Sequence, residues 1–204
     1  MTRDEWLKWR LKGIGASDAP IIMGKSPWKT IDQLWEEKVT GIDNYKDNPS
    51  MARGRELEDT ARALFSKLQD VEVFPKNIIH PEWKFLRASL DGMTIERDLI
   101  VEIKCPNKKD HKEALDGKAP EKYYPQCQHQ LLVTGLPKMY YFSYSPSFKE
   151  QEGACVEVLA DDEYIEDMRT AEKHFWCAVI NKIKPSELPL ALYLSFDPCA
   201  YEGL

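Results

Sequence analysis

Long hydrophobic runs are absent from this chain of 204 residues. No stretch of 18 apolar residues occurs, so the sequence predicts no transmembrane helix. The first five residues carry charges of both signs and lack the apolar centre of a signal peptide, so we expect a cytoplasmic protein. We find no domain boundary. We therefore expect one domain over residues 1–204, long enough to bury roughly 70% of its unfolded surface.

Three further absences limit the possible chemistry of the protein. The five cysteines lie at intervals of 22, 28, 22 and 22 residues without a Cys-x-x-Cys pair, which argues against a zinc ribbon or an iron–sulfur cluster. The four histidines show no metal-binding spacing, and we interpret His129 as a packing residue. An excess of positive charge is also missing, because the net charge is −6. DNA-binding proteins are more often basic, but net charge does not say where the charges lie.

Three charged residues in the middle of the chain are the most informative ones present. Asp91 is followed eleven residues later by Glu102-Ile103-Lys104, at the end of a segment typical of a strand. Because alternate side chains of a strand share a face, Glu102 and Lys104 point the same way and Ile103 points to the other side.

Two carboxylates and an ammonium that converge at a strand end can bind a divalent metal beside a phosphodiester. Hard oxygen ligands suit magnesium. A bound metal polarises the phosphate and lowers the pKa of a bound water, and a lysine can orient that water. This is the PD-(D/E)xK nuclease pattern. Asp…Glu-x-Lys also arises by chance, and the alternative is an ordinary charged strand on a solvated sheet face.

Residues 51–69 predict an amphipathic helix. Its apolar stripe is formed by Leu57, Ala61, Leu64, Phe65 and Leu68. Glu58 borders this stripe, and a carboxylate at the edge of a core needs a partner. Either Arg55 or Arg62 on the same helix is that partner, or Glu58 is a further acidic group near the metal.

A glutamine-rich helix follows at residues 123–135. Gln128 shares a face with Leu131 and Leu132, and a neutral amide can hold a water or a phosphate oxygen without adding charge. We therefore expect Gln128 to help position the attacking water, with Gln126 as the weaker candidate.

The N-terminal region suggests an anion site. Ser17 is expected to cap a short helix that runs through Met23, and the start of a helix offers free N–H groups and a positive dipole end. Arg10 lies seven residues earlier and can fold back towards Ser17. The alternatives are a phosphate pocket and simple helix capping.

The remaining pattern predicts an α/β fold with a central mixed sheet flanked by helices. Helices are expected at residues 3–11, 30–41, 51–69 and 161–183, strands at 71–74, 78–79, 85–90, 93–95, 99–103, 139–144 and 154–159, and a turn at 89–92. The basic segment 108–112 is either a solvated loop or a phosphate contact. The tail 185–204 is expected to pack over the core or a neighbouring subunit.

Five sequence motifs together support a family assignment. They are Arg10…Gly15-Ala16-Ser17, Ala52-Arg53-Gly54-Arg55-x-x-Glu58, Ser89-x-Asp91-Gly92, Glu102-x-Lys104-Cys105-Pro106 and Tyr123…Gln126-x-Gln128. In this order the chain resembles the bacteriophage lambda exonuclease-like (YqaJ-type) alkaline exonucleases, over residues 9–144. Leu90 departs from the proline usual in the family, but it shapes the backbone and binds nothing.

The resemblance implies a PD-(D/E)xK, restriction-endonuclease-like core and a phage- or prophage-encoded enzyme acting in the bacterial host. Such an enzyme digests duplex DNA ends in the 5′-to-3′ direction, usually as a homotrimeric ring. It leaves a 3′ overhang for a single-strand annealing protein. Two Mg²⁺ ions about 4 Å apart are expected in each active site, with Mn²⁺ able to substitute.

The resemblance also implies individual roles. Metal ligands would be Asp91, Glu102, the backbone carbonyl of Ile103, and Glu58. Lys104 and Gln128 would act on the water, and Arg10, Ser17 and Ser89 would bind the 5′-phosphate. Met51 would be a wedge at the DNA fork or, alternatively, a hydrophobic residue that caps the helix. The alternatives are a related endonuclease with the same active site and a non-catalytic DNA-binding recombination scaffold.

Overall fold

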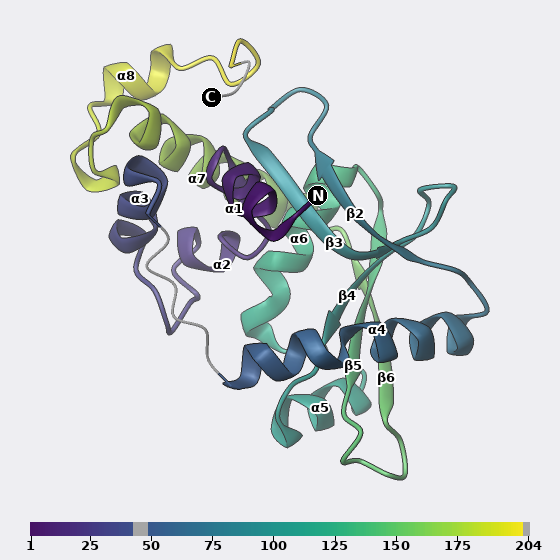
Figure 1. Cartoon of the computed structure of the whole chain (residues 1–204). Coiled ribbons are helices and arrows are strands. Elements are labelled where there is room, and N and C mark those ends of the chain that lie inside the picture. Colours follow the sequence, from purple (N-terminus) through teal and green to yellow (C-terminus); the bar gives the residue numbers. More distant parts are fainter. Residues whose placement is uncertain (43–48, 202–204) are drawn as a thin grey trace.

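Six strands within the described part of the chain form one mixed sheet (Figure 1). The computed structural model describes residues 1–42 and 49–201, apart from the side chains of residues 49 and 51. The strands are β1 (Ile14–Gly15), β2 (Phe74–Ile79), β3 (Leu86–Met93), β4 (Ile100–Lys104), β5 (Lys138–Tyr144) and β6 (Gly153–Leu159). The predicted α/β class is confirmed.

Helices cover this sheet. They are α1 (Arg3–Leu11), α2 (Ala19–Ile22), α3 (Ile31–Thr40), α4 (Pro49–Gln69), α5 (Lys108–Leu115), α6 (Tyr124–Thr134), α7 (Asp162–Asn181) and α8 (Leu190–Ser195), with short 3₁₀ helices at Glu121–Tyr123 and Pro185–Glu187. Within residues 1–42 and 49–201, no helix combines the length and the apolar character needed to span a membrane.

The sheet branches at β3. Strand β2 pairs antiparallel along residues 87–93 of β3. Strand β1 pairs with the first two residues of β3, and β4 pairs with the last two, where Gly92 lies opposite Val101. Because a strand has only two edges, β1 and β4 share the edge of β3 that faces away from β2. Strand β5 then adds parallel to β4, and β6 antiparallel to β5.

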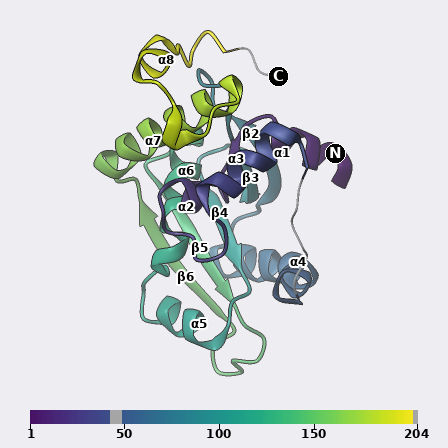
Figure 2. The ribbon, with the colours of Figure 1, turned by 90° about the vertical axis from the view of Figure 1, so that its left-hand side faces the viewer.

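The two faces of the sheet bury different sets of side chains. Val101 and Ile103 of β4 pack in one cluster with Ala61 and Phe65 of α4. Ile100 belongs to the other cluster, together with residues of α6 and α7. Figure 2 shows α4 and α7 on opposite sides of the strands. This alternation confirms the expected phase of β4, with Glu102 on the α6 side.

Local signals set several element ends as expected. Thr30 and Gln33 form the reciprocal capping box at the start of α3, and Gly41 ends that helix with φ = 70°. The C-terminal tail packs over the core, since Phe196 and Tyr201 contact the ring of Phe85 at centroid distances of 6.1 Å.

Other local predictions are wrong. The turn expected at residues 89–92 is the middle of β3, and the separate strand expected at 93–95 is absent. The chain reverses after β3, where the Thr94 hydroxyl donates to Asp98 Oδ1 at 2.6 Å. The basic segment 108–112 is not a loop but the start of α5, capped by Asn107.

Gly92 explains why the turn prediction failed. An added Cβ would lie 2.7 Å from Val101 Cγ1 and 2.7 Å from Val73 Cγ2, closer than real Cβ contacts. The glycine therefore allows two strands and the segment before β2 to approach one another, which is a recognised role of glycine inside strands.

We predict that Gly92→Ala lowers the free energy of unfolding by about 1–3 kcal/mol, the usual cost of overpacking. Gly54→Ala is the matched control, because nothing lies within 4 Å of a Cβ at that helical position. This control should raise stability by about 0.5–1 kcal/mol. Urea unfolding of both variants makes the measurement, and equal effects would contradict the close approach at Gly92.

Candidate active site at the β3–β4 fork

The predicted acidic residues lie where β3 and β4 separate. The ladder between these strands ends at the Gly92–Val101 pair. The next pair in the same register is Asp91 opposite Glu102, and opposite residues of an antiparallel pair share a face. Instead of continuing the backbone ladder, Asp91 uses Oδ2 to accept the N–H of Ile103 at 2.8 Å. The side chain thus closes the ladder and brings the two acids together.

Glu102 is held from three sides. It is 1% exposed, and its Oε1 accepts from Lys104 Nζ and from the amide of Gln126. Its Oε2 accepts from the amide of Gln130. Gln126 and Gln130 are four residues apart on α6 and therefore point to the same side of that helix. Both oxygens of the carboxylate are fixed by these donors.

The structure does not bring Gln128 to this site, contrary to our expectation. Its Nε2 donates to the carbonyl of Leu159 at 2.8 Å, and its Oε1 accepts from the N–H of Asp161 at 3.0 Å. A residue two positions along a helix is rotated by about 200°, so Gln128 points away from Glu102 when its neighbours point towards it. The amide joins α6 to the end of β6.

Glu58 approaches the fork from α4. It pairs with Arg62, which was one of the two predicted partners. Arg62 also donates Nε–H to the carbonyl oxygen of Asp91 at 2.6 Å. One guanidinium therefore joins the helix carboxylate to the backbone of β3, and Glu58 is placed next to the other acids.

The charges of this cluster are mutually dependent. Burial, and then repulsion from Glu102, raise the pKa of Asp91 well above its usual range. Burial also raises the pKa of Glu58, against the attraction of Arg62. For Lys104, burial would lower the pKa, but attraction to Glu102 and Asp91 outweighs burial and raises it. The site holds crowded carboxylates whose repulsion a bound cation would offset.

These residues fit magnesium better than a closed metal centre. Among residues 1–42 and 49–201, no three His, Cys, Asp or Glu side chains form a complete metal-binding group. Magnesium does not require one, because it usually keeps several waters and takes only one or two carboxylates. Asp91 and Glu102 supply two hard oxygen donors side by side, with the main chain of Ile103 in contact and Glu58 beside them.

The predicted anion-binding residues also lie close together. Arg10 Nη2 donates to Ser17 Oγ at 2.9 Å. The guanidinium lies over the ring of Trp6, with Cζ 5.4 Å from the centroid. Trp6 Nε1 in turn donates to Ser89 Oγ at 3.2 Å, and Ser89 donates to Asn77. Trp6 thus links Arg10 to Ser89. Its place in this cluster could have been predicted from sequence, because it lies four residues before Arg10 on α1 and so shares a helix face with it.

A buried ion pair supports this cluster. Ser17 does not cap α2, because the residue at that position is Asp18. Asp18 is 1% exposed and accepts from Lys38 Nζ at 2.7 Å and from Arg10 at 3.2 Å. Lys38 donates as well to the backbone oxygens of Arg10 and Gly13. No local sequence signal indicates this pair, because its two members lie 20 residues apart.

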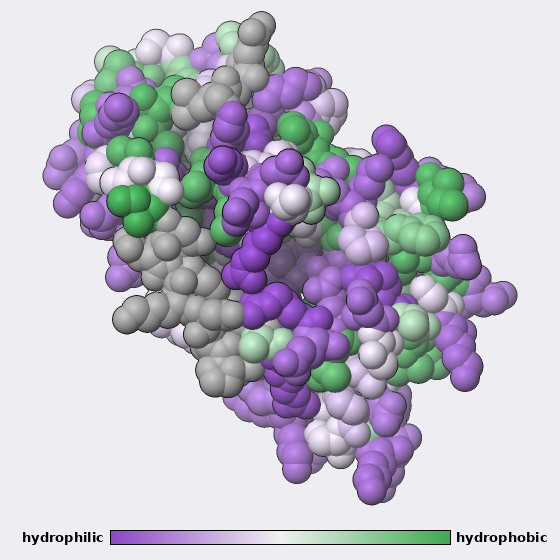
Figure 3. Space-filling view, in the orientation of Figure 1, coloured by the Kyte–Doolittle hydropathy of each residue, from purple (hydrophilic) through white to green (hydrophobic). Residues whose placement is uncertain are grey.

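The fork places the two clusters beside one another. Strand β1 occupies the part of the β3 edge that β4 leaves, and Ser17 lies two residues after the end of β1. In Figure 3 hydrophilic side chains surround a hollow between the α1 region and α4, over the strands of the fork. Met51 belongs to α4, but its side chain lies outside the described residues.

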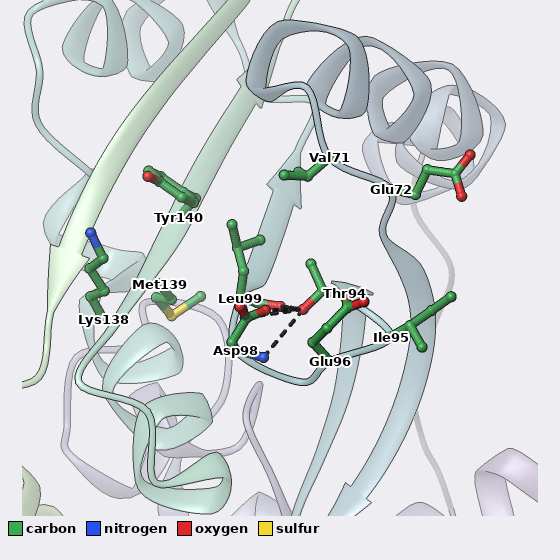
Figure 4. Close-up of a pocket in the computed structure, with 10 residues that line it drawn as sticks. All are labelled: Val71, Glu72, Thr94, Ile95, Glu96, Asp98, Leu99, Lys138, Met139 and Tyr140. Atoms are coloured by element: carbon green, nitrogen blue, oxygen red, sulfur yellow. Dashed lines mark hydrogen bonds between the residues drawn. The ribbon is translucent and has the colours of Figure 1, made fainter.

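A separate cavity of about 520 Å³ opens near the other end of β4 (Figure 4). Three acids, Glu72, Glu96 and Asp98, line it together with one cation, Lys138, which pairs with Glu157. None of the predicted site residues lines this cavity. Its acidic lining does not suit a nucleic acid.

Comparisons with known proteins identify the family of this chain. Residues 5–137 match the YqaJ-like viral recombinase domain. The protein YqaJ of Bacillus subtilis (strain 168) is 37% identical over 180 residues, which are 86% of this chain but 56% of that protein. The chain thus spans little more than half the length of this curated relative.

Solved structures give the same fold. The alkaline exonuclease LHK-Exo from Laribacter hongkongensis superposes with a TM-score of 0.77 at 29% identity, over 88% of this chain and 93% of that one. A phage-related exonuclease from Haemophilus somnus 129PT has a TM-score of 0.63 at 18% identity, over 83% and 96% of the two chains, and supports the fold alone.

The family match covers both clusters at the fork, from Arg10 to Gln130. The chain belongs to the YqaJ-like viral recombinase family, with the fold of an alkaline exonuclease.

Proposed function

We propose that this protein is a metal-dependent exonuclease that digests one strand of linear duplex DNA from its 5′ end and leaves a 3′ overhang. The observation that carries the proposal is the joint placement of Asp91, Glu102 and Lys104 at the β3–β4 fork. The similarity to an alkaline exonuclease and to a viral recombinase family supports a nuclease that takes part in recombination.

The carboxylates and the lysine would have different roles in hydrolysis. A magnesium ion bound by Asp91 and Glu102 would polarise the scissile phosphate and acidify a water. Lys104 stays protonated and contacts Glu102, so it can orient the water and stabilise charge on the phosphate oxygens. Gln126 and Gln130 hold Glu102 in one orientation, and Arg62 holds the backbone of Asp91. We infer that Gln126, and not Gln128, assists the reaction.

The anion-binding cluster of Arg10, Ser17 and Ser89 would set the 5′-to-3′ direction of digestion. Arg10 supplies a fixed positive charge and forked donors, and Ser17 and Ser89 supply hydroxyls. Ser89 lies two residues before Asp91 in β3, so a 5′-phosphate bound there is close to the acids. Each cut creates a new 5′-phosphate, which the cluster can capture one nucleotide further along the strand.

Wider features of the family are part of the same proposal. They are a homotrimeric ring around DNA, two Mg²⁺ or Mn²⁺ ions, Met51 as the wedge at the fork, a single-strand annealing partner, and a phage or prophage gene whose product acts in the bacterial cytoplasm. A ring could place its basic residues on the inner side, facing the DNA, although the chain as a whole has a net charge of −6. An endonuclease could share the carboxylates and the lysine, but it would not need a site for a terminal phosphate.

We predict that Lys104→Ala reduces single-turnover digestion by about 10²–10³-fold, the typical effect of losing one preorganised donor. Folding should be retained, since Lys104 is partly exposed. Lys138→Ala is the control, because that exposed lysine pairs with Glu157 on the same sheet away from the fork. A Lys104→Ala enzyme with near-full activity would rule out the catalytic role.

The glutamines of α6 allow a sharper comparison. Gln126→Ala should slow digestion while leaving the unfolding midpoint nearly unchanged. Gln128→Ala should leave the rate of the folded enzyme intact and lower stability by about 1–3 kcal/mol, because the buried amide loses two hydrogen bonds that contribute about 0.5–1.5 kcal/mol each. The digestion rate and the urea midpoint of each variant are measured on the same preparation. A slow, stable Gln128→Ala enzyme beside a fast, destabilised Gln126→Ala enzyme would place Gln128 in the active site.

We predict that wild-type enzyme prefers a 5′-phosphorylated duplex over a 5′-hydroxyl duplex. Arg10→Ala should slow only the phosphorylated case, by about 10–100-fold, as expected for a lost charge-assisted hydrogen bond of about 1.5–3 kcal/mol. Lys8→Ala on the exposed side of α1 is the matched control. Initial rates on two otherwise identical duplexes make the test. Equal treatment of both ends by wild type would favour the endonuclease alternative.

A further inference from the structure

One large aromatic side chain near the fork is exposed. Trp28 lies between α2 and α3 and is 73% accessible to solvent, although a tryptophan side chain is costly to leave in water. The segment around it is tied to the 3₁₀ helix before α6, since Lys25 pairs with Glu121 at 3.5 Å. Trp28 is therefore exposed on a segment that contacts the 3₁₀ helix beside the active site.

A row of aromatic and cationic side chains connects Trp28 to the catalytic lysine. Lys122 Nζ lies 5.8 Å from the ring centroid of Trp28 and 5.0 Å from that of Tyr123. Lys104 Nζ lies 5.3 Å from the same Tyr123 ring. Tyr123 stacks on the buried ring of Tyr141, with centroids 5.7 Å apart and an interplanar angle of 25°.

The row has the chemistry of a nucleotide-binding surface. Aromatic faces stack on bases of any sequence, and neighbouring cations attract the phosphates. The acids that pair with lysines of the row or beside it include Asp110 with Lys122, Glu121 with Lys25, and Glu102 with Lys104. These acids are each paired with a lysine, and Trp28 remains 73% exposed beside Lys122.

The position of the row relative to the fork suggests which part of the substrate it meets. Ser89 and Lys104 would be opposite each other if the β3–β4 register continued, but the strands diverge before them. The anion-binding cluster includes Ser89 of β3, and the aromatic row begins at Lys104, the last residue of β4. Lys104 contacts both Glu102 and the ring of Tyr123. A strand whose scissile phosphate lies at the fork would therefore have the aromatic row within reach.

We propose that Trp28, with Lys122 and Tyr123, is a stacking site for a base of the DNA strand next to the scissile phosphate. This inference rests on the proposed nuclease function, and it adds a recognition element that reads a base face without reading sequence. The site would hold a single strand, because the faces of paired bases inside a duplex are covered by their neighbours.

The test separates stacking from charge. Fluorescence anisotropy measures the affinity of the protein, with Ca²⁺ in place of Mg²⁺, for a labelled 5′-phosphorylated oligothymidylate and for an abasic chain of equal length and charge. Trp28→Ala should weaken oligothymidylate binding by about tenfold and leave the abasic chain unaffected. Trp28→Phe should restore most of the affinity, because a ring remains. Leu194→Ala, an exposed apolar residue of α8, is the control and should bind like wild type.

The possible failures are distinguishable. If wild type binds and digests DNA but Trp28→Ala binds both chains as wild type does, the stacking site is wrong and the nuclease function stands. Equal losses on both chains would also overturn stacking. If wild type neither binds nor digests DNA, the proposed function fails together with the stacking site.

Discussion

The hydrogen bond from the N–H of Ile103 to the carboxylate of Asp91 is the contact on which the site depends. It ends the β3–β4 ladder with a side chain in place of a backbone partner. The strands can then separate, and β1 fills the edge that β4 leaves. The same bond holds Asp91 beside Glu102, so the geometry of the sheet and that of the active site have one origin. The tight contact at Gly92 keeps the strands together up to this point.

Repulsion between neighbouring carboxylates at the fork opposes folding. Asp91, Glu102 and Glu58 lie close together with like charges, and Lys104 and Arg62 offset part of their repulsion. Such arrangements lower stability and are typical of functional sites. The pair Asp18–Lys38 behaves differently, since each buried charge meets several hydrogen-bonding partners. That pair can hold Arg10 rigidly, as a phosphate-binding guanidinium requires.

Strand and helix periodicity made much of this site predictable from sequence. Alternation in β4 correctly put Glu102 and Lys104 on one side, and the apolar stripe of α4 put Glu58 at its border. The phase of α6 was harder, because glutamines at alternate positions point to both sides and only packing selects the pair Gln126 and Gln130. Contacts between distant segments, such as Asp18 with Lys38, carry no local signature.

The central claim is that the fork forms a metal-dependent, end-dependent nuclease site. The most direct measurement is a time course of label release from one linear duplex, labelled at either the 5′ or the 3′ end, with a closed circular duplex alongside. In magnesium, the account predicts early release of the 5′ label as a mononucleotide and an intact circle, with no release in EDTA. Cleavage of the circle, earlier release of the 3′ label, or digestion without metal would contradict it.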